Sequence, residues 1–224
     1  MKKIFFSLMI VTSILTSCQK EDSNSNLTKP QEQNENTTEN GNSKPKTLVT
    51  KTTYEVVPVI REQNFYLNSA THLGFGKKTR TIVPVVLPLN TVHFYYSVAV
   101  TSSKSPINNL RLATQLSSLL IDHSGFLSSL VSKIDLPEGS KGRADFYLLD
   151  YENQSKFLEK ESFSYYSFGT REALTSGTID INKDFINAIG NIFYIGVRNP
   201  RSTTGENITI EGAAVVEKKI QVYE

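Results

Sequence analysis

The sequence of 224 residues contains one cysteine, no tryptophan and three histidines. The single cysteine, Cys18, has no second thiol in the chain with which to form a disulfide. His72, His93 and His123 are widely separated, and no His-x-x-x-His or Cys-x-x-Cys pair occurs, although a zinc site needs three or four converging ligands. The lack of tryptophan also removes the usual stacking platform of a sugar-binding cleft. The sequence therefore predicts no metal site and no cofactor.

The charges of the chain nearly balance. Lysine and arginine number 24 and aspartate and glutamate 22, which gives a formal net charge of +2. Lys2 and Lys3 account for that excess, so a chain without its first residues is neutral. Because nucleic-acid binding depends on clustered basic residues, we expect no nucleic-acid partner.

The amino-terminal residues have the pattern of an export signal. Lys2 and Lys3 precede an apolar run, Ile4 to Leu15, and small residues lead from this run to Cys18. About a dozen apolar residues are too few to cross a hydrocarbon core of ~30 Å as a helix, so the run is typical of a signal peptide. An ordinary secretory signal with an incidental cysteine is the alternative.

Leu15-Thr16-Ser17-Cys18 resembles the lipobox of bacterial lipoproteins. In that family the cysteine is diacylated on its thiol, the signal is cut just before it, and the new amino terminus is acylated. The resemblance implies a signal peptide of residues 1–17 and a membrane anchor at Cys18. Several acyl chains hold a protein stably, whereas one holds it only marginally. No second apolar run reaches membrane-helix length, so we expect these acyl chains to be the membrane contact.

Gln19-Lys20-Glu21-Asp22 follows the cysteine directly and resembles the short acidic export signal of surface lipoproteins in the Bacteroidetes group. The resemblance implies a location on the outer membrane, facing outward from the cell. The periplasmic face of the same membrane is the alternative.

Residues 18–46 comprise the cysteine and a predicted disordered tether. Leu27 is the one apolar aliphatic residue between positions 19 and 46, and the others are mostly Asn, Gln, Glu, Thr, Ser and Lys. Such a composition cannot bury enough surface to offset the entropy lost on ordering. A coil of this length has an r.m.s. reach of about 30 Å, so the tether would let a folded domain stand clear of the lipid headgroups.

Residues 47–224 read as one mostly-β domain. Val92, Phe94 and Tyr96 alternate with residues of the opposite face along 91–101, the period of a half-buried strand. Similar runs occur at 48–60, 65–73, 79–87, 144–149, 163–168, 177–181, 192–197 and 208–216. About nine strands at this spacing predict a β-sandwich or jelly-roll-like fold. Pro58 and Pro84 interrupt strand-like runs, so we expect those runs at sheet edges or bulges.

Residues 106–135 break the strand pattern. Leu112, Leu116 and Leu119 repeat at helical spacing, and Leu130 and Ile134 continue it after a turn. The spacing predicts two short helices that pack an apolar face onto the sandwich. A mobile cap over one end of the sandwich is the functional alternative.

The last strands of the sequence have a second resemblance. Ile192 to Pro200 ends in Asn199, and a Ser/Thr/Gly turn leads to the long run Ile208 to Val216. This pattern is similar to the closing strands of pre-peptidase-type and Golgi-dynamics-type β-sandwich domains. The resemblance implies a binding or accessory module and transfers no site residue.

Candidate catalytic residues are carboxylates. Asp145, Asp150 and Glu152 surround the predicted strand at 144–149, and Asp180 and Asp184 follow the strand near 178. A glycosidase needs two carboxyl groups about 5–10 Å apart in a cleft, whereas separate carboxylates at strand ends would only be solvated. Asp122-His123-Ser124 has the residue types of a catalytic triad, but sequence neighbours cannot converge as a triad does. We therefore identify no catalytic residue.

Paired tyrosines are the candidate binding residues. Tyr95-Tyr96 and Tyr165-Tyr166 each place one ring on either face of a predicted strand. One ring of each pair belongs in the core, and the other is exposed or at an interface, where tyrosine combines contact area with a hydroxyl. We expect Tyr95 and Tyr166 to form the binding face, if the domain has one.

These observations favour a lipid-anchored, non-enzymatic binding or structural module at the outer membrane, with an envelope protein or glycan as partner. The alternative is a carbohydrate-active enzyme, or its accessory glycan-binding subunit, that uses the strand-end carboxylates. An adhesin or assembly subunit would need an exposed sheet edge that accepts a strand.

Overall fold

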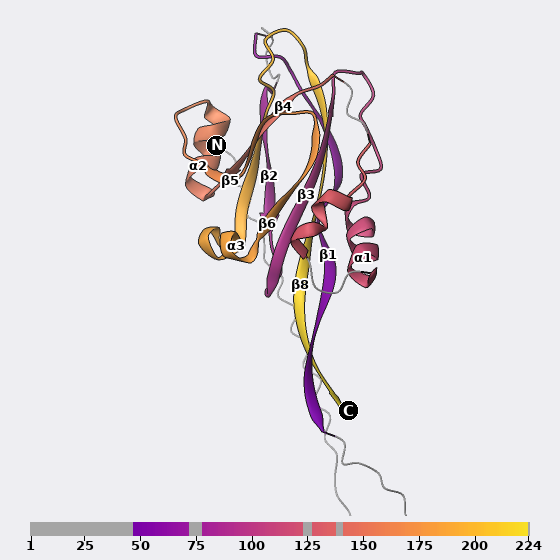
Figure 1. Cartoon of the computed structure of the whole chain (residues 1–224). Helices are drawn as coiled ribbons and strands as arrows, with labels where there is room; N and C mark the ends of the chain where they lie inside the picture. Colours follow the sequence, from indigo (N-terminus) through magenta and orange to yellow (C-terminus); the bar gives the residue numbers. More distant parts are fainter. Residues whose placement is uncertain (1–46, 72–77, 123–126, 138–140, 224) are drawn as a thin grey trace, which may run out of the picture. The chain divides into compact units, whose positions relative to one another are not determined.

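The computed structural model describes residues 47–71, 78–122, 127–137 and 141–223, and the signal, the tether and Cys18 lie outside this part. The strands form two four-stranded antiparallel sheets, which confirms the predicted β-sandwich, and Figure 1 shows their arrangement. The strands are β1 (Leu48–Leu67), β2 (Arg80–Val86), β3 (Thr91–Thr101), β4 (Ala144–Leu149), β5 (Tyr166–Leu174), β6 (Ser176–Asn182), β7 (Ile192–Arg198) and β8 (Glu206–Tyr223). The helices are α1 (Leu112–Asp122), α2 (Tyr151–Glu159) and α3 (Lys183–Ile189), with 3₁₀ turns η1 (Leu127–Ser129) and η2 (Val131–Lys133).

Sheet A has the strand order β1-β8-β3-β6 and sheet B the order β2-β7-β4-β5. The predicted strands 48–60 and 65–73 are one strand, β1, because the polar residues between them lie at a register shift and not at a turn. This accounts for the eight strands among the described residues, where about nine were expected. Pro58 lies in edge strand β1 beside a register shift, and Pro84 lies in edge strand β2. The predicted edge positions of both prolines are confirmed.

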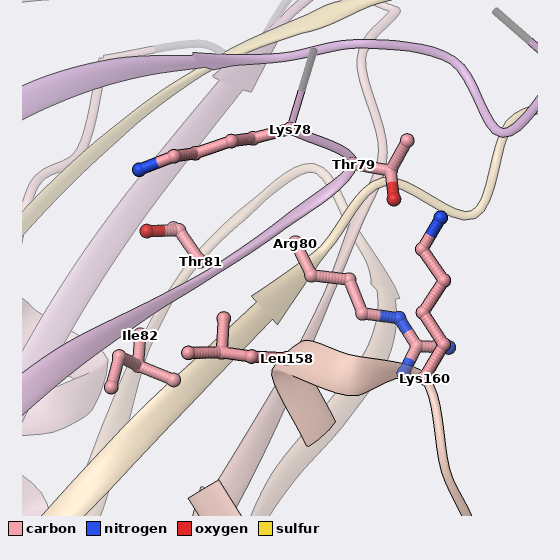
Figure 2. A pocket seen from close by; sticks show the side chains of 7 residues that line it. All are labelled: Lys78, Thr79, Arg80, Thr81, Ile82, Leu158 and Lys160. Carbon is pink, nitrogen blue, oxygen red and sulfur yellow. The ribbon is translucent and has the colours of Figure 1, made fainter. Parts of the chain in front are cut away.

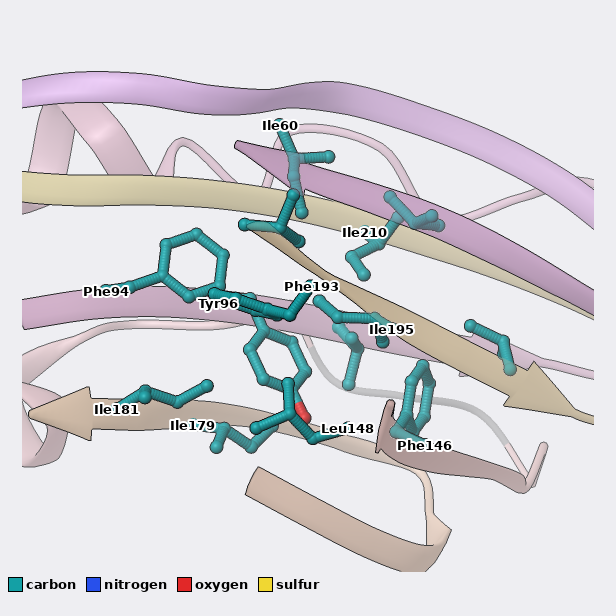
Figure 3. Close-up of a cluster of buried hydrophobic side chains, with 14 of the residues drawn as sticks. Ile60, Phe94, Tyr96, Phe146, Leu148, Ile179, Ile181, Phe193, Ile195 and Ile210 are labelled. Carbon is teal, nitrogen blue, oxygen red and sulfur yellow. The ribbon is translucent and has the colours of Figure 1, made fainter. Parts of the chain in front are cut away.

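The main core lies between the sheets (Figure 3), where side chains from both inner faces interdigitate. Phe94 of β3 meets Phe193 of β7 edge to face, with 5.7 Å between ring centroids, a favoured aromatic geometry. Tyr96 is fully buried, and its hydroxyl donates to the carbonyl oxygen of Gly169 at 2.7 Å. That hydrogen bond removes the penalty of burying a bare hydroxyl.

A helical cover buries the outer face of sheet A. Leu112 and Leu116 of α1, with Leu130 beside η1, pack on Tyr95 and Val215. The predicted helical pair within 106–135 therefore does pack on the sandwich, although its second member is the two 3₁₀ turns. The start of α1 is fixed by the carboxylate of Glu211 on β8, which accepts from the backbone N–H groups of Leu112 at 2.8 Å and Ala113 at 3.3 Å. A carboxylate there satisfies donors that a helix leaves free and suits the positive end of its dipole.

The outer face of sheet B is covered by α2, which the sequence did not predict. Phe157 is the buried apolar residue of α2 and packs on Tyr147 and Leu149 of β4. Gly196 of β7 allows this approach, because a Cβ there would lie 3.0 Å from the Phe157 ring and 2.7 Å from Leu149. Asp150 begins the helix by accepting from the backbone N–H of Asn153 at 2.8 Å.

The first and last strands continue together past the rest of sheet A as a two-stranded ribbon (Figure 1). Leu48 to Glu55 of β1 pair with Val216 to Tyr223 of β8, whereas the pairing of β8 with β3 ends at Val216. Lys218 and Glu55 form an ion pair across the ribbon. In the described part of the chain, no helix is long and apolar enough to cross a membrane.

We predict that alkaline pH unfolds the domain through its buried phenols. Burial raises the pKa of Tyr95, Tyr96 and Tyr147, with further contributions from Asp180 for Tyr95 and from Glu172 for Tyr147. Their stabilisation is complete below the unfolded-state pKa of about 10 and declines as pH rises above it, since the unfolded chain then ionises more readily.

The test is Tyr96→Phe. The free energy of unfolding of wild type should exceed that of the variant at neutral pH, and the difference should narrow above about pH 10. Urea unfolding at several pH values measures this difference. Tyr223→Phe, at a 70% exposed position, should show no pH-dependent difference. A constant difference for Tyr96→Phe across the range would contradict the prediction.

Candidate functional site

Neither predicted binding tyrosine lies on an open face. Tyr95 is fully buried on the outer side of sheet A, and its hydroxyl donates to the carbonyl oxygen of Leu127 at 2.6 Å. The expectation that Tyr95 is exposed is wrong because η1 and α1 cover that face. Tyr166 is partly buried against the main core, whereas its neighbour Tyr165 is 47% exposed. The two predicted residues belong to different sheets and form no common surface.

The candidate carboxylates do not converge on one cleft. Asp150 caps α2, and Glu152 is exposed in the first turn of that helix. Asp180, on β6 of sheet A, contacts Nδ1 of His93 at 2.8 Å. Asp145 is on β4 of sheet B and takes part in an ion pair there. Each of the three aspartates has a local partner, so the paired geometry of a glycosidase is not formed by these residues.

The structure instead brings together a row of charged residues across sheet B. Arg80 of β2 is in register with Arg198 of β7, and Arg198 is in register with Asp145 of β4. Nε and Nη2 of Arg198 both donate to Oδ2 of Asp145, at 2.8 and 2.6 Å. The backbone N–H of Ala173 donates to Oδ1 at 2.8 Å. We call Arg80, Arg198 and Asp145 the arginine row.

Each of the two arginines lies over an aromatic ring. The guanidinium carbon of Arg198 lies 5.2 Å from the ring centroid of Tyr147, and that of Arg80 lies 5.1 Å from that of Phe157. Nη1 of Arg80 also donates to the carbonyl oxygen of Phe157 at 2.7 Å. Cation–π contact and this hydrogen bond hold the two guanidinium groups in place.

The two arginines differ in their counter-charge. For Arg198, burial alone lowers the pKa, but the hydrogen bond and charge of Asp145 outweigh it, so the pKa is raised. For Arg80, burial and then the neighbouring charge of Arg198 lower the pKa. Arginine stays protonated in proteins, so the shift records unfavourable surroundings and not loss of charge. In the described part of the chain, Arg80 has no carboxylate partner.

Two clefts flank the row. The β2–α2 cleft has a volume of about 540 Å³, with a side hollow of about 200 Å³ that reaches Arg198. Figure 2 shows Ile82 and Leu158 side by side in this cleft, with the Lys78 amine and Thr81 hydroxyl at one end and Arg80 and Lys160 at the other. Its lining is Lys78, Thr79, Arg80, Thr81, Ile82, Leu158 and Lys160. The β4–β7 cleft, of about 610 Å³, lies beyond Arg198.

The charges of the β4–β7 cleft are largely compensated. Two carboxylates, Asp145 and Glu172, line it together with three arginines, Arg143, Arg198 and Arg201. Nη1 of Arg201 donates to the fully buried Glu206 at 3.1 Å, and the Tyr147 hydroxyl donates to Glu172 at 2.7 Å. The β2–α2 cleft is therefore the more electropositive of the two.

Several sequence candidates lie outside the described residues: Cys18, His72, His123, Ser124 and the Gly-rich turn at 74–77. Among the described residues, no group of three or more His, Cys, Asp or Glu side chains is arranged to hold a metal ion. The sequence did carry one signal of the site, since three of the four positions from Lys77 to Arg80 are basic.

We predict that Asp145→Asn destabilises the domain by about 3 kcal/mol, because it leaves Arg198 without its counter-charge in a partly buried position. The double variant Asp145→Asn/Arg198→Met should lose less than the sum of the single losses, by about 1 kcal/mol or more. Urea unfolding measures both. Asp184→Asn, an exposed change of the same type, is the control, and equal losses for the two aspartates would contradict the prediction.

The chain matches no protein-family model, no curated protein and no solved structure. We therefore infer its function from its own residues and geometry.

Proposed function

We propose that this protein is a lipoprotein of the outer membrane, anchored through Cys18 and facing outward, whose domain 47–224 is a non-enzymatic binding module. The arginine row and the β2–α2 cleft form its ligand site. One observation carries the binding role: Arg80, held by Phe157, has no described carboxylate partner and lies in a cleft lined by cations. Arginine fixed on an aromatic ring is a recurrent anchor of binding sites.

The anchor rests on the sequence. Leu15-Thr16-Ser17-Cys18 ends the apolar run, and 28 residues, 19–46, separate the cysteine from the domain. A coil of that length reaches about 30 Å, which would hold the ligand site near the membrane while leaving it free to turn. Gln19-Lys20-Glu21-Asp22 supports the outward face.

The contacts of the candidate carboxylates favour a binding function over a catalytic one. Asp145, Asp150 and Asp180 each hold another group of the fold. A glycosidase needs two carboxyl groups free to act on one bond. An accessory glycan-binding subunit of a carbohydrate-active enzyme needs no such pair of carboxyl groups. The site therefore agrees with that alternative as well as with an independent binding module.

The β1–β8 ribbon favours an assembly subunit as a second candidate. Beyond Val216, the N–H of Glu217 still donates to the carbonyl oxygen of Asn90 at 3.0 Å, and from Lys218 onward β8 pairs only with β1 among the described residues. No described strand pairs with the outer edges of this part of the ribbon, so a partner strand could add there. A two-stranded ribbon alone is marginally stable in water, so a partner strand would stabilise it. Lys51 on β1 acts against such pairing, as charges do on natural edge strands.

We predict that the protein incorporates a fatty-acid probe in its native cells and that Cys18→Ser abolishes the incorporation. Ser23→Ala, in the tether, should incorporate the probe like wild type. Protease added to intact cells should degrade the domain if it faces outward. Labelled Cys18→Ser protein would contradict the anchor, and protection of the domain in intact cells would contradict the outward face.

A photoreactive side chain tests which surface is occupied. Leu158 is 42% exposed and lines the β2–α2 cleft, whereas Gln221 is exposed on the ribbon. With the probe at one of these positions at a time in the full chain, illumination of intact cells should give an adduct from position 158 and none from 221. An adduct from 221 alone would favour the assembly subunit and overturn the ligand site in the cleft.

A further inference from the structure

We infer that the β2–α2 cleft binds an oxyanion carried on a hydroxyl-rich ligand, that is, an acidic saccharide. The inference rests on the proposed binding function and names the chemistry of its ligand. It is carried by three features of the cleft: its uncompensated positive charge, the unused donors of Arg80, and the hydroxyl and apolar groups beside them.

The cleft and its side hollow concentrate cations. Lys78, Arg80 and Lys160 line them, and Arg198 closes the inner end. Asp145 compensates Arg198, which leaves three positive charges, and none of the described residues that line either space is a carboxylate. Low-dielectric walls focus such a field and favour an anionic ligand.

A structural role at the carboxyl end of α2 accounts for only part of this charge. The carboxyl end of a helix carries about half a negative charge. Arg80 donates to the carbonyl oxygen of Phe157 in the last turn, and Lys160 follows the helix. Half a negative charge offsets less than one of the three cations, so a net positive charge remains for a ligand.

Arg80 has N–H groups available to donate hydrogen bonds to a ligand, and its position is already restricted. A guanidinium has five N–H donors, and one described acceptor, the Phe157 carbonyl oxygen, is hydrogen-bonded to Arg80. The Phe157 ring beneath it limits its freedom, so little entropy is lost when a ligand binds. Two oxygens of a carboxylate or of a phosphate can accept two parallel hydrogen bonds from such a group. An anion would also relieve the repulsion between Arg80 and Arg198.

The remaining lining suits a sugar. Thr79 and Thr81 contribute hydroxyl groups, and Ile82 and Leu158, which lie beside each other (Figure 2), provide an apolar floor. Neither threonine hydroxyl has a hydrogen-bond partner among the described contacts, so both can pair with sugar hydroxyls. A volume of about 540 Å³ lies within the range typical of small-molecule sites. Hydroxyl donors beside an apolar floor favour a saccharide over a flat phosphate-bearing surface such as a membrane.

Two polymers that differ only in charge provide the test. Polygalacturonate carries a carboxylate on each sugar, and its fully methyl-esterified form carries none. Isothermal titration calorimetry of the full chain in neutral detergent should show binding of the first and at least tenfold weaker binding of the second. The affinity for polygalacturonate should fall steeply with added salt.

Lys160→Asn is the decisive variant. Lys160 has a left-handed backbone with φ 63°, a conformation that asparagine adopts readily, so the change removes one cation without disturbing the fold. We expect about tenfold weaker binding of polygalacturonate, the loss of one charge-assisted hydrogen bond. Lys156→Gln, on the same helix but outside the cleft, removes the same charge and should bind like wild type. Equal losses in the two variants would overturn the inference.

The other outcomes separate this inference from the proposed function. Equal binding of both polymers would overturn the requirement for an anion while leaving a binding module. Binding of phosphatidylglycerol vesicles or polyglutamate, but not of polygalacturonate, would overturn the saccharide and identify a lipid headgroup or an acidic protein. Failure of all these probes would overturn the inference, while an adduct from position 158 in intact cells would still support the binding role.

Discussion

Burial of the central strands on both faces is the constraint on which the rest of the domain depends. Every residue of β4 is buried, and His93 is the one residue of β3 that is not. Packing of sheet on sheet buries only one face of each strand, so each sheet needs a cover on its outer side. The cover of sheet A comes from α1 with the 3₁₀ turns, and that of sheet B from α2. The candidate site lies at the margin of the second cover, where the carboxyl end of α2 meets the edge strand β2.

Three acidic or amide side chains fix the beginnings of the three helices. Glu211 on β8 receives the first N–H groups of α1, Asp150 begins α2, and Asn182 begins α3. Each joins a strand to a helix by satisfying donors that no helix satisfies internally. Asp150, which lies beside a strand end in the sequence, was a candidate for chemistry and proves to be a helix cap. A carboxylate just after a strand can therefore be a catalytic candidate or a helix cap, and a helix that begins directly after it indicates the cap.

The strands and the edge positions of Pro58 and Pro84 could be predicted from the sequence because they depend on local pattern and on the missing N–H of proline. The exposure of Tyr95 could not, because alternation marks two different faces without telling solvent from a second layer. The helix α2 could not be predicted because Phe157 is its one buried apolar residue. A single apolar residue gives no helical period. The arginine row could not be predicted for another reason. The register of β2 with β7 pairs positions 80 and 198, which are 118 residues apart, and local sequence patterns do not determine such a pairing.

Arg80 opposite Arg198 is the place where the domain departs from the rules that it follows elsewhere. Like charges directly across a strand pair destabilise a sheet, and Asp145 compensates only one of the two arginines. The buried carboxylates of the described chain are paired: Asp145 has Arg198, and Glu206 has Arg201 and Ser102. No buried side-chain nitrogen or oxygen lacks a partner among the described residues. In natural proteins such local conflicts concentrate at functional sites, where a bound ligand can provide the missing counter-charge. The ring and the carbonyl oxygen of Phe157 hold Arg80 beside Arg198 at the lining of the cleft. The repulsion that costs stability is therefore the same one that a bound anion would relieve.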